Sequence, residues 1–279
     1  MKNHSISFIG GGNMAGSLIG GLIADGYAPN LLTVADVDGE KRTQLQERFG
    51  IRAAASNAEA TRHSDILVIA VKPQMVEAVA RELASEERDE PKQLVISIAA
   101  GIRTNSLAMW LGGKVPVVRA MPNTPALVQS GATVLYANEY VNVLQRETAE
   151  SILRAVGLTQ WVADETLMDA VTALSGSGPA YFFLIMEALE QAAGSLGLPP
   201  ELARVLTIQT AFGAAKMALE NTSGPEELRI QVTSPGGTTE RALQVLREGN
   251  LCDLFRRALQ AAHERSVELS KLLGKDSHA

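Results

Sequence analysis

Cysteine, histidine and aromatic residues are scarce in this chain. Its 279 residues include one cysteine, four histidines and only 4% Phe, Trp and Tyr. Cys252 alone cannot form an intramolecular disulfide, and Cys and His nowhere cluster with the spacing of metal ligands. We therefore expect no metal site, and we expect a cytoplasmic protein because the cytoplasm keeps thiols reduced.

Long apolar segments and basic stripes are missing as well. The segment from Ile6 to Ala24 has the apolar character of a signal peptide, but three consecutive glycines and Asn13 interrupt it. Elsewhere the longest strongly apolar stretch, Ala180 to Met186, falls far short of the ~20 residues of a membrane span. The 31 Asp and Glu outnumber the 25 Lys and Arg, with no basic stripe for a phosphate backbone. We expect a soluble protein that binds neither membranes nor nucleic acids.

The first 163 residues alternate short apolar runs with helical patterns. Runs rich in Val and Ile that lack strict polar and apolar alternation are typical of parallel strands covered on both faces. We expect strands at Ser5–Ile9, Leu32–Ala35, Ile66–Val71, Leu94–Ile98, Val115–Arg119, Ser130–Ala137 and Thr159–Val162. Helical patterns cover Glu40–Phe49, Gln74–Leu83, Thr104–Leu111 and Val143–Val156. The predicted fold class is α/β, with a Rossmann-type parallel sheet over residues 1–163 that binds a dinucleotide.

After Ala163 the strand patterns stop, and we predict an all-α domain over residues 164–279. Its helices are expected at Glu165–Leu174, Pro179–Leu196, Pro200–Asn221, Glu226–Val232, Thr238–Arg247 and Leu251–Leu273. The third of these is apolar on nearly every side, and such a helix must be buried on nearly every side. A small helical domain has too little interior for that, so we expect burial against a second copy of the chain.

A glycine motif follows the first expected strand. Gly10, Gly12 and Ala15 give the pattern G-x-G-x-x-A at a strand-to-helix turn, which is the context of a dinucleotide fingerprint. The first glycine permits the turn, the second lets the pyrophosphate approach the backbone, and the small third residue lets helix and strand pack closely. A glycine-rich turn without a ligand is the alternative.

Asp36 ends the second run, where an acidic side chain binds the adenosine ribose hydroxyls and repels a 2′-phosphate. This favours NADH, or use of both NADH and NADPH. Lys41 and Arg42 oppose that interpretation, since either could reach a 2′-phosphate.

Three further segments follow strand runs, where ligands lie in open parallel sheets. They are Val71 to Pro73, Ala99 to Gly101, and the proline-rich segment Met121 to Ala126. Lys72 is either a ligand contact or an ordinary surface lysine. Asn123 is the polar side chain that we expect beside the nicotinamide.

Two small-residue loops interrupt the helical half, at Leu174 to Tyr181 and at Thr233 to Glu240. Each presents backbone N–H groups and hydroxyls at a helix start, which is a ready anion site. Simple helix capping, by Ser234 or Thr238 in the second loop, is the alternative. Two such loops beside a dinucleotide domain are better explained by a small carboxylate substrate.

No histidine lies in any of these motifs. His4, His63, His263 and His278 stand near the chain ends, before a strand and in the last helix. An alcohol or ketone substrate needs a positioned acid or base, usually His or Lys. A cyclic imine needs less help, because its basic nitrogen is readily protonated and its iminium carbon then accepts a hydride.

Together these motifs resemble those of the pyrroline-5-carboxylate reductases, from about Ser5 to Leu273. The resemblance implies reduction of 1-pyrroline-5-carboxylate to L-proline with NADH or NADPH. It also implies dimers with interlocked helical domains, with decamers as a further assembly. The implied cofactor-binding residues are Ile9, Gly10, Gly11, Gly12, Asn13, Met14, Asp36, Asn57, Ala70, Val71, Lys72, Pro73, Ala99, Ala100, Gly101 and Asn123.

The resemblance further implies a substrate site in the helical half. Thr239 is the implied catalytic residue, with its hydroxyl bonded to the ring nitrogen. The implied substrate-binding residues are Glu165, Ser177, Ser234, Gly236, Gly237, Thr238 and Thr239. Two positions depart from the family pattern: Asp36 replaces the Ser or basic residue of some relatives, and others carry Ala in place of Thr238.

Two other functions stay open at this point. One is a different reductase of the same architecture, acting on other imines or on 3-hydroxyacids, although the lysine of the hydroxyacid enzymes is absent after Ala180. The other is a protein that binds NAD(P) without turnover.

Overall fold

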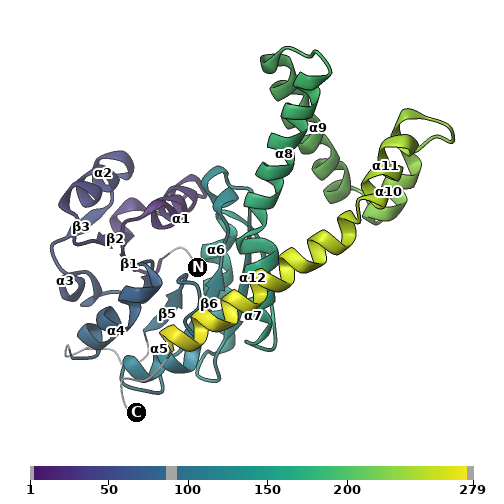
Figure 1. Ribbon diagram of the computed structural model, residues 1–279. Helices are drawn as coiled ribbons and strands as arrows, with labels where there is room; N and C mark the ends of the chain where they lie inside the picture. Colours follow the sequence, from purple (N-terminus) through teal and green to yellow (C-terminus); the bar gives the residue numbers. More distant parts are fainter. Residues whose placement is uncertain (1–2, 86–92, 275–279) are drawn as a thin grey trace. The chain divides into compact units, whose positions relative to one another are not determined.

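The structure, a computed structural model shown in Figure 1, describes residues 3–85 and 93–274. Its described residues form an eight-stranded sheet in the order β3-β2-β1-β4-β5-β6-β7-β8, parallel throughout except between β6 and β7. The strands are β1 (Ile6–Ile9), β2 (Leu32–Ala35), β3 (Arg52–Ala54), β4 (Ile66–Ile69), β5 (Leu94–Ser97), β6 (Val117–Met121), β7 (Gly131–Ala137) and β8 (Gly157–Trp161). The predicted Rossmann-type sheet is confirmed.

Strand β3 was not among the expected runs. It is three residues long, and its sequence Arg52-Ala53-Ala54 has no large apolar side chain that would distinguish it from a loop. Pairing with β2 through Thr33, Val34 and Ala35 supplies the hydrogen bonds that define it. A strand of this kind depends on its neighbour rather than on its own propensity.

Helices cover both faces of the sheet and give it two cores. Along β1, Ile6 and Phe8 face one core while Ile9 faces the other, as the period of two in a strand requires. The first core is closed by α1 (Asn13–Ala24), α2 (Gly39–Phe49) and α6 (Val143–Arg154). The second is closed by α3 (Asn57–Thr61), α4 (Val76–Ser85) and α5 (Thr104–Trp110).

Local sequence signals fix where several of these helices begin and end. The Asp38 carboxylate accepts the N–H groups of Glu40 and Lys41 at the start of α2, and Gly50 ends that helix with a φ of 69°. Asn142 and Gln145 form a capping box at the start of α6. Short 3₁₀ turns complete the connections at η1 (Pro29–Leu31), η2 (Pro73–Met75) and η3 (Thr124–Val128).

Beyond Ala163 the described chain is helical, as expected. The helices are α7 (Leu167–Val171), α8 (Gly178–Ser195), α9 (Pro200–Glu220), α10 (Pro225–Gln231), α11 (Thr238–Glu248) and α12 (Leu251–Leu273). The helix expected from Glu165 to Leu174 is shorter, because a π-helical turn, η4 (Thr172–Gly176), replaces its end. No helix among the described residues is long and apolar enough to cross a membrane.

Packing divides the chain into two compact units at a different place from the predicted boundary after Ala163. The first unit comprises residues 1–177 together with 262–279, and the second comprises residues 178–261. The last strand does end at Trp161, but Met168 and Asp169 of α7 are buried within the first unit. The sequence pattern marks the end of the strands, whereas packing extends the first unit through α7 and adds the last turns of α12.

The second unit has almost no core of its own. Within α8 only Gly178 is buried, within α9 only Ala203, and within α10 and α11 no residue. Val205 and Phe212 of α9 are 62% and 60% exposed in the single chain. The apolar surface that the sequence predicts is therefore present and uncovered, as expected of a surface that packs against a partner.

Candidate active site

The expected cofactor residues follow strand ends that lie in one row. Ile9 pairs with Ala35 on β2 and with Ile69 on β4, and Ile69 pairs with Ser97 on β5. The residues that come next, Gly10, Asp36, Ala70 and Ile98, therefore begin loops along a single edge. The strand order reverses between β1 and β4, which is the point where open parallel sheets bind ligands.

The glycine loop has one position without room for a side chain and one with open space. A Cβ at Gly10, whose φ is +102°, would lie 2.7 Å from the Ala70 carbonyl oxygen. A Cβ at Gly12 would meet nothing within 4 Å. Gly12 is also the N-cap of α1 and provides no side-chain cap to its N–H groups. The start of α1 is thus open to an anion such as a pyrophosphate.

Asp36 is engaged by the backbone on both carboxylate oxygens. The Gly11 N–H donates to Oδ2 at 2.7 Å, and the Asp38 N–H donates to Oδ1 at 2.8 Å. These bonds fix the carboxylate at the carboxyl end of β2, beside the glycine loop. The Asp36 carboxylate lies where it can accept a hydrogen bond from a ribose hydroxyl, because each oxygen keeps a further lone pair.

The two cations that could favour a 2′-phosphate have partners in the chain. The Lys41 ammonium lies 3.5 Å from the Asp38 carboxylate, although both groups are largely exposed. The Arg42 guanidinium donates to the Asp36 carbonyl oxygen. Neither interaction prevents a new contact, because the Lys41 pair is largely exposed and the Arg42 guanidinium has further N–H donors besides the one on the Asp36 carbonyl oxygen.

Asn57 and Lys72 also lie at this edge. The Asn57 amide donates to the Glu82 carboxylate at 3.1 Å, which links α3 to α4. Lys72 is exposed and stands directly before the 3₁₀ turn Pro73–Met75. Its side chain faces solvent at the end of β4, so the structure leaves both of its alternatives open.

Glu165 is bound within the first unit. Its carboxylate accepts the Thr104 N–H at 2.8 Å and the Thr104 hydroxyl at 2.9 Å, and it pairs with Arg119 at 3.2 Å. Arg103, the N-cap of α5, supplies no side-chain cap, so Glu165 caps that helix from a distant part of the chain. The expected contact between Glu165 and the substrate stays a prediction. A bound substrate would have to share the Glu165 carboxylate with Thr104 and Arg119.

The pKa values of two groups near Glu165, Tyr136 and Asp164, are shifted from their ordinary values. Partial burial, and then the negative charges of Glu165, Glu139 and Asp164, raise the pKa of Tyr136 above its ordinary value. A backbone N–H two residues further on donates to the Asp164 carboxylate and lowers the pKa of that group. Both shifts move away from neutrality, so neither side chain exchanges a proton near pH 7.

Asn123 fixes the proline-rich segment after β6. Its Oδ1 accepts the Ala132 N–H at 2.9 Å, and its Nδ2 donates to the Ser175 hydroxyl at 3.3 Å. The amide therefore joins this segment to η4. Ser177 follows η4, and its backbone N–H donates to the Thr172 carbonyl oxygen at 2.9 Å. The proposed place of Asn123 beside the nicotinamide stays a prediction.

The expected substrate loop belongs to the second unit. Gly236 has a φ of +71°, which favours glycine, and Gly237 is the N-cap of α11, where a Cβ would lie only 3.0 Å from the Ser234 carbonyl oxygen. The Gly236 N–H donates to the Glu240 carboxylate at 2.7 Å, and the Gly237 N–H donates to the Ser234 carbonyl at 3.0 Å. Neither Ser234 nor Thr238 acts as the N-cap, so the simple capping alternative is wrong.

The loop already binds a carboxylate of its own chain through the bond from Gly236 to Glu240. This contact could not be predicted from the sequence, because an acidic residue in the first turn of a helix, such as Glu240, is common. Arg119 and Thr104 were missed as well, although an arginine among the apolar residues of a strand indicates a buried ion pair.

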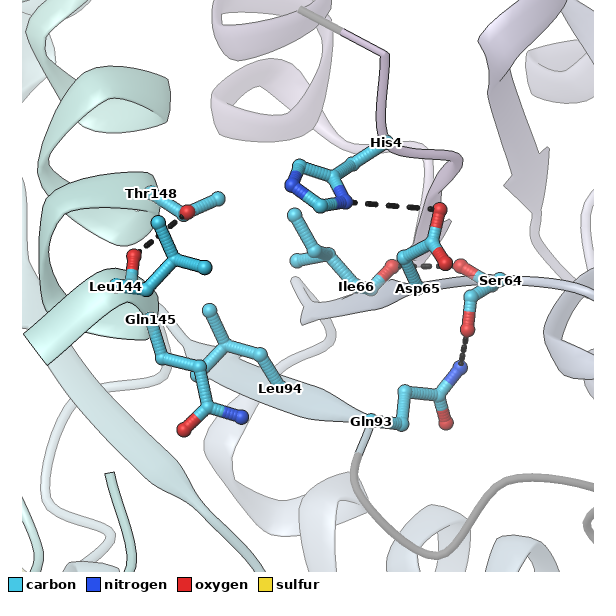
Figure 2. A pocket seen from close by; sticks show the side chains of 9 residues that line it. All are labelled: His4, Ser64, Asp65, Ile66, Gln93, Leu94, Leu144, Gln145 and Thr148. Carbon is cyan, nitrogen blue, oxygen red and sulfur yellow. Dashed lines mark hydrogen bonds and ion pairs between the residues drawn. The ribbon is translucent and has the colours of Figure 1, made fainter. Parts of the chain in front are cut away.

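The described histidines stand outside the loops that form the expected cofactor edge: His63 precedes β4 and His263 belongs to α12. His4 lies at the opposite edge, where β4 and β5 begin, beside a cavity of about 280 Å³ shown in Figure 2. Its Nδ1 is 3.8 Å from the Asp65 carboxylate, and Thr148 of α6 lines the other side. His278 lies outside the described residues. The described part of the chain contains no group of three His, Cys, Asp or Glu that could hold a metal.

Comparison with known proteins identifies the family. A family model described as pyrroline-5-carboxylate reductase dimerisation matches residues 165–269. Another, described as NADP oxidoreductase coenzyme F420-dependent, matches residues 5–101. The pyrroline-5-carboxylate reductase of Pseudomonas aeruginosa is 50% identical over 275 residues, covering 99% of this chain and 100% of that protein. The chain belongs to the pyrroline-5-carboxylate reductase family.

Solved structures of the pyrroline-5-carboxylate reductase family extend the match to the whole fold. The pyrroline-5-carboxylate reductase of Coxiella burnetii matches with a TM-score of 0.90 and 50% identity, covering 95% of this chain and 98% of that one. The Plasmodium falciparum enzyme with NADP bound matches with a TM-score of 0.84 and 30% identity, covering 97% and 99%. The match therefore extends over nearly the whole of each chain.

Proposed function

We propose that this protein reduces 1-pyrroline-5-carboxylate to L-proline, the last step of proline biosynthesis, with NADH or NADPH as the hydride donor. The observation that carries the proposal is the 50% identity to the Pseudomonas aeruginosa reductase along nearly the whole of both chains. The site chemistry described above supports it independently.

The residues along the cofactor edge fit a dinucleotide. Gly12 leaves open space at the start of α1, and Asp36 is fixed where it can accept ribose hydroxyls. When bound there, NAD(P)H supplies the hydride. The glycine loop binds the pyrophosphate, and the loops after β4, β5 and β6 contact the nicotinamide half.

The loop of the second unit fits the substrate carboxylate. Its Gly236 N–H donates to the carboxylate of Glu240 in the present structure, so it is an anion donor already. Thr239 stands in the first turn of α11, where its hydroxyl orients the ring nitrogen of the substrate. Addition of hydride forms the new C–H bond, and the π electrons of the C=N bond move to the protonated nitrogen to give the amine.

We further propose that NADH is at least as good a donor as NADPH. Asp36 places a negative charge beside the ribose, and a 2′-phosphate would be repelled by it. Lys41 and Arg42 are engaged with Asp38 and with the Asp36 carbonyl oxygen. The proposal therefore rests on the Asp36 carboxylate, which the Gly11 and Asp38 N–H groups hold in place.

The assembly is proposed to be a homodimer, with a decamer of five such dimers as a further step. The dimerisation model covers residues 165–269, which include the helices with exposed apolar faces. We place the reaction in the cytoplasm, where the exposed thiol of Cys252 stays reduced.

One assay tests the proposal: oxidation of NADH and of NADPH with pyrroline-5-carboxylate, compared with open-chain 3-oxo acids. We expect turnover with the cyclic imine, none with the oxo acids, and kcat/KM for NADH at least equal to that for NADPH. Turnover with the oxo acids alone would identify a hydroxyacid enzyme. Cofactor binding without any turnover would identify a non-catalytic protein.

A further inference from the structure

Asp169 on α7 is a buried acidic residue that the proposed reaction does not use. It is 3% exposed, and its Oδ1 accepts the hydroxyl of Ser266 at 2.7 Å and that of Ser270 at 3.2 Å. The two serines are four residues apart, so they lie on one face of α12 and both reach the same oxygen. They are 5% and 3% exposed, and within α12 no other residue is buried.

The same turns of α12 pack against the expected cofactor loop. Gly101 has a φ of +76°, and a Cβ built there would lie 3.4 Å from Leu273 and 3.7 Å from the Ser270 backbone nitrogen. Leu273 also packs against the core formed by α4 and α5. The loop that follows β5 is thus held between the sheet and the last turns of α12.

The segment that follows this loop is held by a residue close to Asp169 in the sequence. Thr104, three residues after Gly101, is bound by Glu165, which stands four residues before Asp169. Two carboxylates therefore hold the loop. Glu165, just before α7, acts through the start of α5, and Asp169, within α7, acts through α12.

We propose that Asp169 is a positioning residue for the dinucleotide. By binding Ser266 and Ser270 it fixes α12 against Gly101, and so fixes the segment Ala99 to Gly101 where it meets the nicotinamide half of NAD(P)H. The inference rests on the proposed function, because it takes this edge of the sheet as the cofactor site.

The test uses the full-length assembled protein with Ser266→Ala and Ser270→Ala combined. We expect Kd and KM for NAD(P)H to rise about tenfold, the effect of losing roughly two net hydrogen bonds that favour the binding geometry. KM for pyrroline-5-carboxylate should change less than about twofold, since its carboxylate binds elsewhere. Kd is measured from NADH fluorescence without substrate.

Two variants separate positioning from stability. Asp169→Asn keeps the Oδ1 acceptor that both serines use and should bind the cofactor like the wild type. Thr148→Ala removes another buried hydroxyl, which donates to the Leu144 carbonyl in α6, far along the chain from the loop. It should lower the melting temperature without changing Kd for NAD(P)H.

If the double serine variant loses stability as Thr148→Ala does and keeps the wild-type Kd, Asp169 is only structural and the inference is wrong. Should the double variant fail to fold, Ser270→Ala alone provides the same test, with a smaller expected rise in Kd for NAD(P)H. A wild-type protein that does not bind NAD(P)H would overturn the proposed function itself, which is a distinguishable result.

Discussion

Gly10 and Gly12 stand two residues apart in one loop and are required for different reasons. Gly10 has a left-handed φ and faces the Ala70 carbonyl oxygen at a distance that no Cβ tolerates. Gly12 has an ordinary extended φ and open space in front of it. The fold requires a glycine at position 10, whereas Gly12 leaves open space where we propose that the pyrophosphate binds.

Alanine substitutions should separate these roles. Gly10→Ala strains the backbone and pushes β1 and β4 apart, so we expect a large fall in melting temperature. Gly12→Ala should fold with a melting temperature within a few degrees of wild type and lose most of its NAD(P)H affinity, because the methyl group occupies the pyrophosphate position. Thermal melts and NADH fluorescence titrations measure the two effects. Unchanged cofactor affinity in Gly12→Ala would contradict the assigned position of the pyrophosphate.

Thr239 and Thr238 form a second pair, at the start of α11. If the Thr239 hydroxyl orients the ring nitrogen, Thr239→Ala should lower kcat for pyrroline-5-carboxylate by about 10²–10³, as for other polar contacts made in the transition state. Thr238→Ala is the matched control and should retain nearly full activity, because the family pattern accepts Ala at this position and any substrate contact of Thr238 would then come from its backbone N–H. Equal rates for Thr239→Ala and the wild type would rule out the catalytic role. Steady-state kinetics with saturating cofactor provide the measurement.

At the scale of elements, the long strands and helices could be predicted from the sequence because each carries its own pattern. Strand β2 and helix α12 have the bounds that were expected. Strand β3 could not be predicted, since it is defined by its neighbour β2 and not by its side chains. The π-helical turn η4 was missed for a related reason: its wider turn depends on tertiary contacts.

The alignment of the expected cofactor residues along one edge was predictable, because strand ends in a parallel sheet share one edge and the sequence shows which residues follow each strand. Their contacts with the cofactor stay a prediction. The partners of Glu165 could not be predicted, because they come from β6 and from the start of α5, which lie 46 and 61 residues away in sequence. Long-range pairing of this kind leaves no periodic signal. The same holds for Asp169 and its two serines.

Glu165 should therefore matter for stability. Arg119 is only 3% exposed, so removing its partner leaves a buried guanidinium without a carboxylate. We expect Glu165→Ala to reduce the free energy of unfolding by about 3–5 kcal/mol. The double variant Arg119→Met with Glu165→Leu should recover part of that loss. Urea denaturation measures both, and a loss below about 1 kcal/mol for Glu165→Ala would mean that the pair does not hold α5.

At the scale of the whole molecule, the second unit depends on a partner. Its helices bury almost nothing within one chain, while Val205, Phe212 and their neighbours expose apolar surface that water solvates poorly. We therefore expect the isolated monomer to be unstable and the melting temperature to rise with protomer concentration.

A charge on that surface should dissociate the assembly. We expect Phe212→Asp to shift the protein to smaller, inactive species in light scattering and to lower its melting temperature. Gln46→Asp, which adds the same charge to the exposed face of α2, is the control and should leave mass and activity unchanged. An intact, active oligomer carrying Phe212→Asp would show that this face of α9 is not buried in the assembly.

The return of α12 to the first unit has a consequence for how the protein is made. Chains emerge from the ribosome in sequence order, and N-terminal domains of many proteins fold before the rest has been synthesised. Here Asp169 and Gly101 receive their packing partners only when residues 266–273 have emerged. We therefore expect the first unit to stay incomplete during most of translation, and a chain released early to lack the packing that supports the proposed cofactor loop at Gly101.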